Sequence, residues 1–218
     1  LVPMIGENRL FAYFGLKQLN EHPRIGIKAL MDAAKRKGNW TISDVVFGIA
    51  PRINAAGRIE HGKIAVDILT AANQETAAKL AEQIESLNSK RRGLDQEITK
   101  EALKMIDEQK KSTVVYSGNW HKGVVGIAAS RLIETHYKPT VVLAEKEGEL
   151  TGSARSVKGF DLYNAIKSCE QYLEKFGGHK YAAGLSLKKE NLQNFIEAFE
   201  KAVSSTITKE QLVPEIGI

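Results

Sequence analysis

The sequence predicts an α/β fold with a helical first part and a sheet-containing second part. Residues 1–75 place apolar side chains at helical spacing, with interruptions at glycine and proline. Residues 74–111 then form one long apolar stripe, which is typical of an extended helix. After Ser112, short runs rich in β-branched residues alternate with helical segments, which is the pattern of an α/β sheet domain.

In the first part, Thr41 has the chemistry of a helix N-cap. Residues 51–58, PRINAAGR, contain Pro51 and Gly57 and predict a loop between helices. The helices predicted around this loop are residues 8–20, 26–38, 41–50 and 61–72.

We interpret residues 76–111 as a helix that connects two domains, with a coiled coil as the alternative. At 1.5 Å per residue such a helix is on the order of 50 Å long. Gly93 is the position where we expect a bend. The tail, residues 206–218, has no helical stripe and is interpreted as the start of a further segment.

In the second part, the predicted strands are residues 112–118, 139–145, 149–156 and 181–187. The predicted helices are residues 123–136, 161–176 and 191–203.

Composition narrows the function classes. The net charge of +5 permits nucleic-acid binding, although a solvated basic surface explains it equally well. No apolar run reaches the roughly 18 residues of a membrane helix, so we expect no membrane partner. The single cysteine, Cys169, excludes an internal disulfide and a cysteine-rich zinc site, and we expect a packed thiol in a reducing cytoplasm.

Two stretches of the second part combine glycine with polar side chains. Gly123 and Gly126 open a predicted helix, and His121 just before it could donate to a phosphate; a tight strand-to-helix turn is the alternative. Ser153 and Arg155 are two residues apart on a predicted strand, so both point to the same face. A hydroxyl and a guanidinium together suit a terminal phosphate, and ordinary polar residues of an edge strand are the alternative.

A third stretch, FGGHKYAAG, predicts a turn at Gly177 and Gly178 with His179 at its tip, facing a ligand or, alternatively, serving a structural role. In PRINAAGR, the side chains of Arg52, Asn54 and Arg58 either line a backbone-binding channel or tie two helices together.

Taken together, the motifs resemble RecJ-type single-stranded-DNA exonucleases of the DHH phosphoesterase superfamily. The motifs that carry the resemblance, in chain order, are GENR, PRINAAGR, WHKGVVGIAASRL, GSARS and FGGHKYAAG. The resemblance spans Leu1 to about Leu187, and PRINAAGR followed by WHKGVVGIAASRL is its most specific part.

The resemblance implies an architecture. Residues 1–75 would be the C-terminal part of a DHH domain, and residues 76–111 the connecting helix. Residues 112–205 would be a DHH-associated α/β domain with a mixed sheet, and residues 206–218 the truncated start of an oligonucleotide-binding barrel.

The resemblance also implies a 5′-to-3′ exonuclease that hydrolyses single-stranded DNA in repair and recombination. Ser153 and Arg155 would hold the 5′ phosphate. Gly177 and Gly178 would present His179, the one catalytic residue expected here, to the scissile phosphate region.

In the same family, Arg52, Asn54, Arg58 and His121 would line the DNA path. The catalytic Mn²⁺ or Mg²⁺ would be held by motifs upstream of this chain, so we assign no metal ligand within it. The chain would then be an inactive fragment of the enzyme. The alternatives are another DHH phosphoesterase, acting on short oligonucleotides or cyclic dinucleotides, and a non-catalytic nucleic-acid-binding module.

Overall fold

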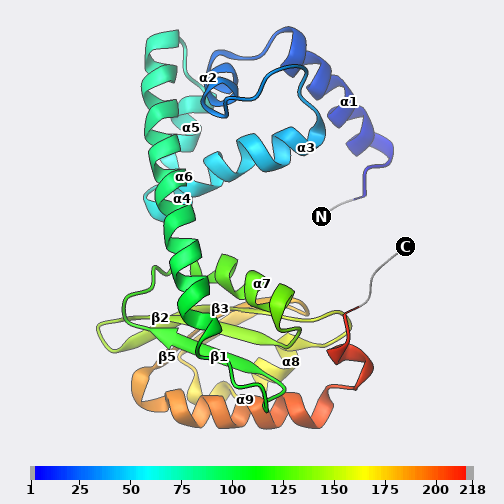
Figure 1. The fold of residues 1–218 in the computed structure, drawn as a ribbon, viewed down its shortest axis with the longest axis vertical. Coiled ribbons are helices and arrows are strands. Elements are labelled where there is room, and N and C mark those ends of the chain that lie inside the picture. The colour runs from blue at the N-terminus through cyan, green and yellow to red at the C-terminus, as the bar shows by residue number, and fades with distance from the viewer. Residues whose placement is uncertain (1–2, 215–218) are drawn as a thin grey trace. The chain divides into compact units, whose positions relative to one another are not determined.

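A computed structural model describes residues 3–214 as two compact units, Leu1–Arg92 and Gly93–Ile218. Helix α6 (Gln74–Leu103) contributes residues to both units and is uninterrupted at Gly93 (Figure 1). The prediction of a helix to Lys111 was therefore too long, because the helix ends at Leu103 and is followed by turns. Asn73 immediately precedes the helix, and its side chain accepts the Thr76 N–H as an N-cap does.

The first unit is helical, as predicted. Leu30, Trp40, Ile49, Ile68 and Ile84 form its main core. Ile84 comes from α6. The other helical elements of this unit are α1 (Gly6–Glu21), α2 (Ile25–Ala33), α3 (Ile42–Asp44), the π-helical turn η1 (Val45–Ile49), α4 (Ala50–Ile59) and α5 (Lys63–Leu69).

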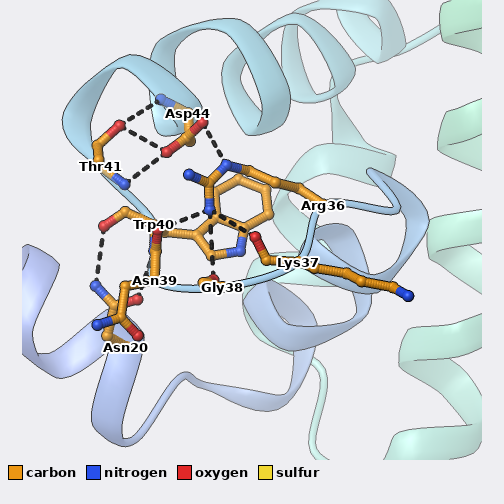
Figure 2. Close-up of polar contacts among 8 residues, drawn as sticks. All are labelled: Asn20, Arg36, Lys37, Gly38, Asn39, Trp40, Thr41 and Asp44. Carbon is orange, nitrogen blue, oxygen red and sulfur yellow. Dashed lines mark hydrogen bonds and ion pairs between the residues drawn. The ribbon is translucent and has the colours of Figure 1, made fainter.

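The loop that leads into α3 is fixed around the buried Trp40 (Figure 2). Asn20 of α1 binds both backbone groups of Trp40, donating to its carbonyl at 3.0 Å and accepting its N–H at 2.7 Å. The Arg36 guanidinium lies 5.8 Å from the Trp40 ring centroid and forms an ion pair with Asp44. Hydrogen bonds from the Thr41 side chain and backbone, helped by Arg36, lower the pKa of Asp44. Thr41 and Asp44 form a capping box, which confirms Thr41 as the N-cap.

The prediction of a loop at residues 51–58 was wrong, because these residues form most of α4. Pro51 directly follows the π-helical turn η1, which runs into α4 without leaving the helical conformation, and a π-helical turn is one of the ways in which a helix accommodates a proline. Ala55 and Ala56 are fully buried, and Ala56 packs with Ala65 and Leu87. The small residues that looked like a loop therefore allow close packing of helices.

The second unit contains a five-stranded mixed sheet with the order β1-β2-β3-β5-β4. Strands β1 and β2 are parallel and joined through helix α7 (Val125–Thr135), and the other neighbouring pairs are antiparallel. The strands are β1 (Thr113–Ser117), β2 (Thr140–Lys146), β3 (Glu149–Arg155), β4 (Lys175–His179) and β5 (Ala182–Lys188). This topology confirms the predicted mixed α/β fold.

Helices cover the sheet on both faces (Figure 1). Helix α7 lies on one face, against β2 and β3. Helices α8 (Leu162–Lys167) and α9 (Leu192–Thr206) lie on the other face. There Phe195 and Phe199 of α9 are fully buried in the largest core, together with Cys169, whose pKa is raised by burial.

The predicted helix over residues 161–176 breaks into three elements. Helix α8 ends at Lys167, the 3-10 turn η2 covers Glu170–Tyr172, and Lys175 and Phe176 already belong to β4. Phe176 pairs with Leu185 of β5 and packs against the core, which favours a strand over a continued helix.

The described end of the chain packs on the second unit. Ile207 is buried in its core, and Leu212 of the 3-10 turn η4 (Glu210–Leu212) packs against that core. The predicted barrel start falls partly on residues 215–218, which lie outside the described residues.

Candidate nucleic-acid interface

Ser153 and Arg155 lie on β3 beneath the first turn of α7. A Cβ on Gly126 would lie 3.1 Å from Ser153 Oγ and 3.2 Å from Arg155 Nη2. Both side chains therefore point toward the helix, as their spacing of two residues predicts. Both residues are partly buried, and Arg155 Nη1 donates to the carbonyl of Ala154 at 2.8 Å. The structure thus brings together two motifs that are about 25 residues apart in the sequence.

Strand register extends this face toward the edge of the sheet. Ser153 pairs with Gly184 of β5, and Gly184 pairs with Gly177 of β4. In the next row, Arg155 pairs with Ala182, and Ala182 pairs with His179. Directly paired residues project to the same face, so Arg155 and His179 share a face across two strand spacings, about 10 Å.

Beyond α7 this face has almost no side chains covering its backbone. Gly177, Ala182 and Gly184 are exposed, and His179 is exposed at the end of β4. A guanidinium and a hydroxyl therefore border a bare strip of sheet, with an imidazole on its far side. Such a surface can bind an anion at one edge and let a backbone lie along the strip.

The predicted turn at Gly177 and Gly178 was wrong. Both glycines lie within β4, and the turn to β5 is made by Lys180 and Tyr181. Gly178 has φ +154°, and a Cβ there would meet the Ala182 carbonyl oxygen at 2.3 Å. Its lack of a side chain thus permits the close approach of β4 and β5, and His179 is the last residue of a strand.

His121 lies in the short segment between β1 and α7, as predicted. Its Nδ1 accepts the Gly123 N–H at 3.1 Å, which leaves Nε2 as the donor of the neutral ring. The preceding Trp120 is buried, and its Nε1 donates to Glu101 of α6 at 2.7 Å. These contacts build the tight turn that we had named as the alternative, and they leave one imidazole nitrogen able to donate.

Arg52, Asn54 and Arg58 all lie on α4 in the first unit. The Arg52 side chain is 11% exposed and pairs with Glu85 of α6. It also donates to the Gly48 carbonyl at 2.7 Å. These contacts favour the alternative in which Arg52 ties helices together. Asn54 and Arg58 are exposed.

Two polar contacts of the second unit escaped the sequence analysis. Asp95 of α6 is 1% exposed and binds Arg131 of α7, with Nε 3.0 Å from both carboxylate oxygens. The contact between Trp120 and Glu101 is the second. An acidic residue on the apolar side of a predicted helix is the signal that could have revealed Asp95, whereas nothing in the sequence pairs it with Arg131.

The described residues, 3–214, contain neither a candidate metal site nor a candidate membrane span. Within that range no group of three or more His, Cys, Asp or Glu side chains is placed to hold a metal ion. Nor does any helix of that range have the length and hydropathy needed to cross a membrane.

Comparison with known proteins gives one family. Residues 109–205 match the DHHA1 domain. The single-stranded-DNA-specific exonuclease RecJ of Bacillus subtilis is 38% identical over 98% of this chain. The protein of the same description from Haemophilus influenzae is 34% identical over 97%. The chain spans 28% and 39% of the lengths of these two relatives.

Solved structures of RecJ are also similar to this chain. RecJ of Thermus thermophilus in complex with Mn²⁺ superposes with a TM-score of 0.86 and 30% identity, over 94% of this chain and 31% of that one. Its complex with Mg²⁺ gives a TM-score of 0.87, over 94% of this chain and 32% of that one. The motifs, the mixed sheet and these similarities lead to one conclusion: nearly the whole of this chain is homologous to a part of the RecJ exonucleases, and its residues 109–205 match the DHHA1 domain.

Proposed function

We propose that this chain is the phosphate- and DNA-binding part of a 5′-to-3′ single-stranded-DNA exonuclease. The whole enzyme would hydrolyse phosphodiester bonds in DNA repair and recombination, in the cytoplasm. The observation that carries the proposal is the shared face of Ser153, Arg155 and His179 beside the bare strip of Gly177 and Gly184. The names of the relatives, which describe single-stranded-DNA-specific exonucleases, support it.

Each residue of this face has a proposed role. The Arg155 guanidinium offers two parallel donors and the Ser153 hydroxyl a third, which suits the terminal oxygens of a 5′ phosphate. Gly177 would let the DNA backbone approach this face of the sheet. Gly178, the next residue of the strand, would act indirectly by permitting the close approach of β4 and β5. His179 would be the catalytic residue of this part, in contact with the scissile phosphate. The backbones of His179 and Arg155 are two strand spacings apart, about 10 Å, and both side chains project from the same face of the sheet.

The proposed DNA path uses fewer residues than the sequence suggested. Asn54 and Arg58 stay proposed contacts of single-stranded DNA, and His121 would donate from Nε2. Arg52 would instead fix α4 to α6, because its side chain is mostly buried against Glu85.

The similar crystal structures are complexes with Mn²⁺ or Mg²⁺. The residues described here do not fit such a metal site, since they form no cluster of metal-ligating side chains. We therefore propose that the intact enzyme uses Mn²⁺ or Mg²⁺ held outside this chain, and that the part described here binds phosphates.

The test is binding of a 12-nucleotide single strand with or without a 5′ phosphate, measured by fluorescence anisotropy at one stated, low salt concentration. We expect the phosphate to tighten binding about tenfold, as contacts with charged groups do. Arg155→Ala should remove that preference. Lys146→Ala is the matched control, because it removes one positive charge from an exposed side chain of the same unit.

Equal affinity of the parent chain for both strands would contradict the pocket. A second measurement separates the enzyme from a binding module. The chain alone is expected to release no nucleotides with Mn²⁺ added, whereas the longer protein that contains it should degrade a long strand from the 5′ end. Preference of that longer protein for a dinucleotide would favour the other DHH phosphoesterases.

A further inference from the structure

We propose that Gly126 is a positioning residue for 5′-phosphate recognition. Its missing side chain leaves the space in which the Ser153 hydroxyl and the Arg155 guanidinium take their places. This inference rests on the proposed function of those two residues. It adds a residue that touches no substrate and acts through its neighbours.

The geometry around Gly126 is specific. A Cβ built there would lie 3.1 Å from Ser153 Oγ, 3.2 Å from Arg155 Nη2 and 3.4 Å from Ser153 Cβ. The first two distances are shorter than the 3.4–4 Å of ordinary van der Waals contact. A methyl group therefore forces the hydroxyl and the guanidinium to shift by a few tenths of an ångström. No other atom within reach lies as close, so the crowding falls on the two side chains that we assign to the phosphate.

Helix α7 is held too firmly to move away instead. Arg131 on this helix makes contacts of 2.9–3.0 Å to the buried Asp95 of α6. At the other end, Trp120 precedes the helix and is anchored to Glu101 of α6. Ala128, Ala129 and Leu132 of the same helix are also fully buried. The two side chains on β3, rather than the helix, have to yield.

The backbone of Gly126 does not itself require glycine. The residue is helical, and glycine is less favourable in a helix than alanine. Local structure therefore favours alanine here, and the contact with Ser153 and Arg155 is what favours glycine. The contact with the two phosphate-binding side chains, and not the formation of the helix, therefore accounts for glycine at this position.

Gly93 provides a matched control for the experiment. It is also a helical glycine, in α6, and a Cβ there would meet nothing within 4 Å. Gly126→Ala and Gly93→Ala thus make the same chemical change and gain the same helix propensity. They differ in whether the new methyl touches the two phosphate-binding side chains.

The experiment measures dissociation constants of the 12-nucleotide strand, with and without its 5′ phosphate, for the parent, Gly126→Ala, Gly93→Ala, Arg155→Ala and the Gly126→Ala/Arg155→Ala pair. We expect Gly126→Ala to reduce the phosphate preference about tenfold, because charge-assisted contacts depend on alignment. Its affinity for the strand without the phosphate should not change. Gly93→Ala should bind both strands as the parent does. In the Arg155→Ala background, Gly126→Ala should alter the phosphate preference no further.

The outcomes separate this inference from the proposed function. If Arg155→Ala abolishes the preference and Gly126→Ala leaves it intact, the role of Gly126 is overturned and the pocket stands. If the parent shows no preference, the pocket itself is overturned and the role of Gly126 with it. Equal weakening for both strands would indicate lost structure and count against a positioning role.

A second variant covers the case in which Gly126→Ala does not fold. Ser153→Ala removes Oγ, the atom nearest to the added methyl, and should restore the fold of the Gly126→Ala chain as judged by circular dichroism. Failure of this second change to restore the fold would overturn the crowding on which the proposal depends.

Discussion

Two adjacent glycines, Gly177 and Gly178, have different reasons for lacking a side chain. At Gly178 a Cβ would overlap the Ala182 carbonyl oxygen at 2.3 Å and the Ala183 Cα at 2.5 Å. At Gly177 a Cβ would meet nothing within 4 Å. The fold therefore requires glycine at position 178 and tolerates alanine at position 177.

This difference gives a stability prediction. Gly178→Ala should lower the free energy of unfolding by about 2 kcal/mol or more, because the methyl forces β4 away from β5. Gly177→Ala should leave it within about 0.5 kcal/mol, or raise it slightly by restricting the unfolded chain. Urea unfolding of both variants beside the parent checks this, and equal loss of stability in the two would contradict it.

At the scale of single residues, the sequence could predict which side chains share a face but not how the glycines are used. Ser153 and Arg155 project together because they are two apart on a strand. The Gly-Gly pair looked like a turn because glycine is common in turns, and only the partner strand shows that Gly178 serves close strand pairing. Gly126 was recognised as part of a glycine-containing helix start, whereas its contact with Ser153 and Arg155 depends on tertiary packing.

At the scale of elements, Glu200 of α9 holds the start of β1. Its carboxylate accepts the backbone N–H groups of Lys111 at 3.0 Å and Ser112 at 2.9 Å. The Ser112 and Ser204 hydroxyls also donate to it. Burial alone would raise the pKa of Glu200, but these hydrogen bonds outweigh burial and lower it.

A pH dependence follows from the lowered pKa of Glu200. A carboxyl whose pKa is lower in the folded chain stabilises the fold above its ordinary value of 4.5 and loses this contribution as the pH falls through the folded-state pKa. Glu200→Gln should therefore be less stable than the parent at pH 7, and the gap should narrow in acid. Urea midpoints between pH 3 and pH 7 measure it.

Glu197→Gln on the same helix is the control for this measurement, because the Glu197 carboxylate accepts a hydrogen bond from Gln193 and none from β1. A gap between the Glu200→Gln variant and the parent that stays constant with pH would show that the carboxylate charge is not what stabilises this junction.

Element types were easiest to predict where one periodicity was sustained. The alternation after Ser112 and the stripe of α6 both gave the right element. PRINAAGR failed because proline and glycine suggest a loop, while the burial of Ala55 and Ala56 depends on partners from α5 and α6. Residues 161–176 failed because a helical pattern in sequence could not show that Phe176 pairs with β5.

At the scale of the whole molecule, the two units differ in how completely each buries its own apolar side chains. The second unit has one contiguous core, with Phe195 and Phe199 of α9 fully buried. In the first unit α1 has no buried residue, and Phe11 and Phe47 are 77% and 79% exposed. Leu10 and Phe14 are also exposed on α1, and large apolar side chains on a surface favour association.

We therefore expect residues 93–218 to fold alone, with one cooperative thermal transition. Residues 3–92 produced separately should associate, as seen by light scattering. Calorimetry and scattering of the two pieces beside the whole chain test this. A second unit that melts without cooperativity would show that its core is insufficient, and a monomeric first unit would show that its exposed side chains do not associate.

The family and the mixed α/β fold were the most predictable features of the whole molecule. They were predictable because the motifs occur in order along the chain and the strand–helix alternation is regular. The similarity to RecJ and to its crystal structure confirms both predictions. The boundary between the two units, which falls inside α6 between Arg92 and Gly93, could not be predicted from the sequence, since the apolar stripe of this helix continues across it.

The outer edge of β4 has a consequence for solubility. An edge strand offers unpaired N–H and C=O groups to any passing chain, and long flat edges seed aggregation. β4 is only five residues long, begins with the charged Lys175 and is followed by Lys180. Its two glycines provide no side chains that a foreign strand could pack against. The shortness of this strand and the lysines at its two ends therefore oppose sideways growth of the sheet.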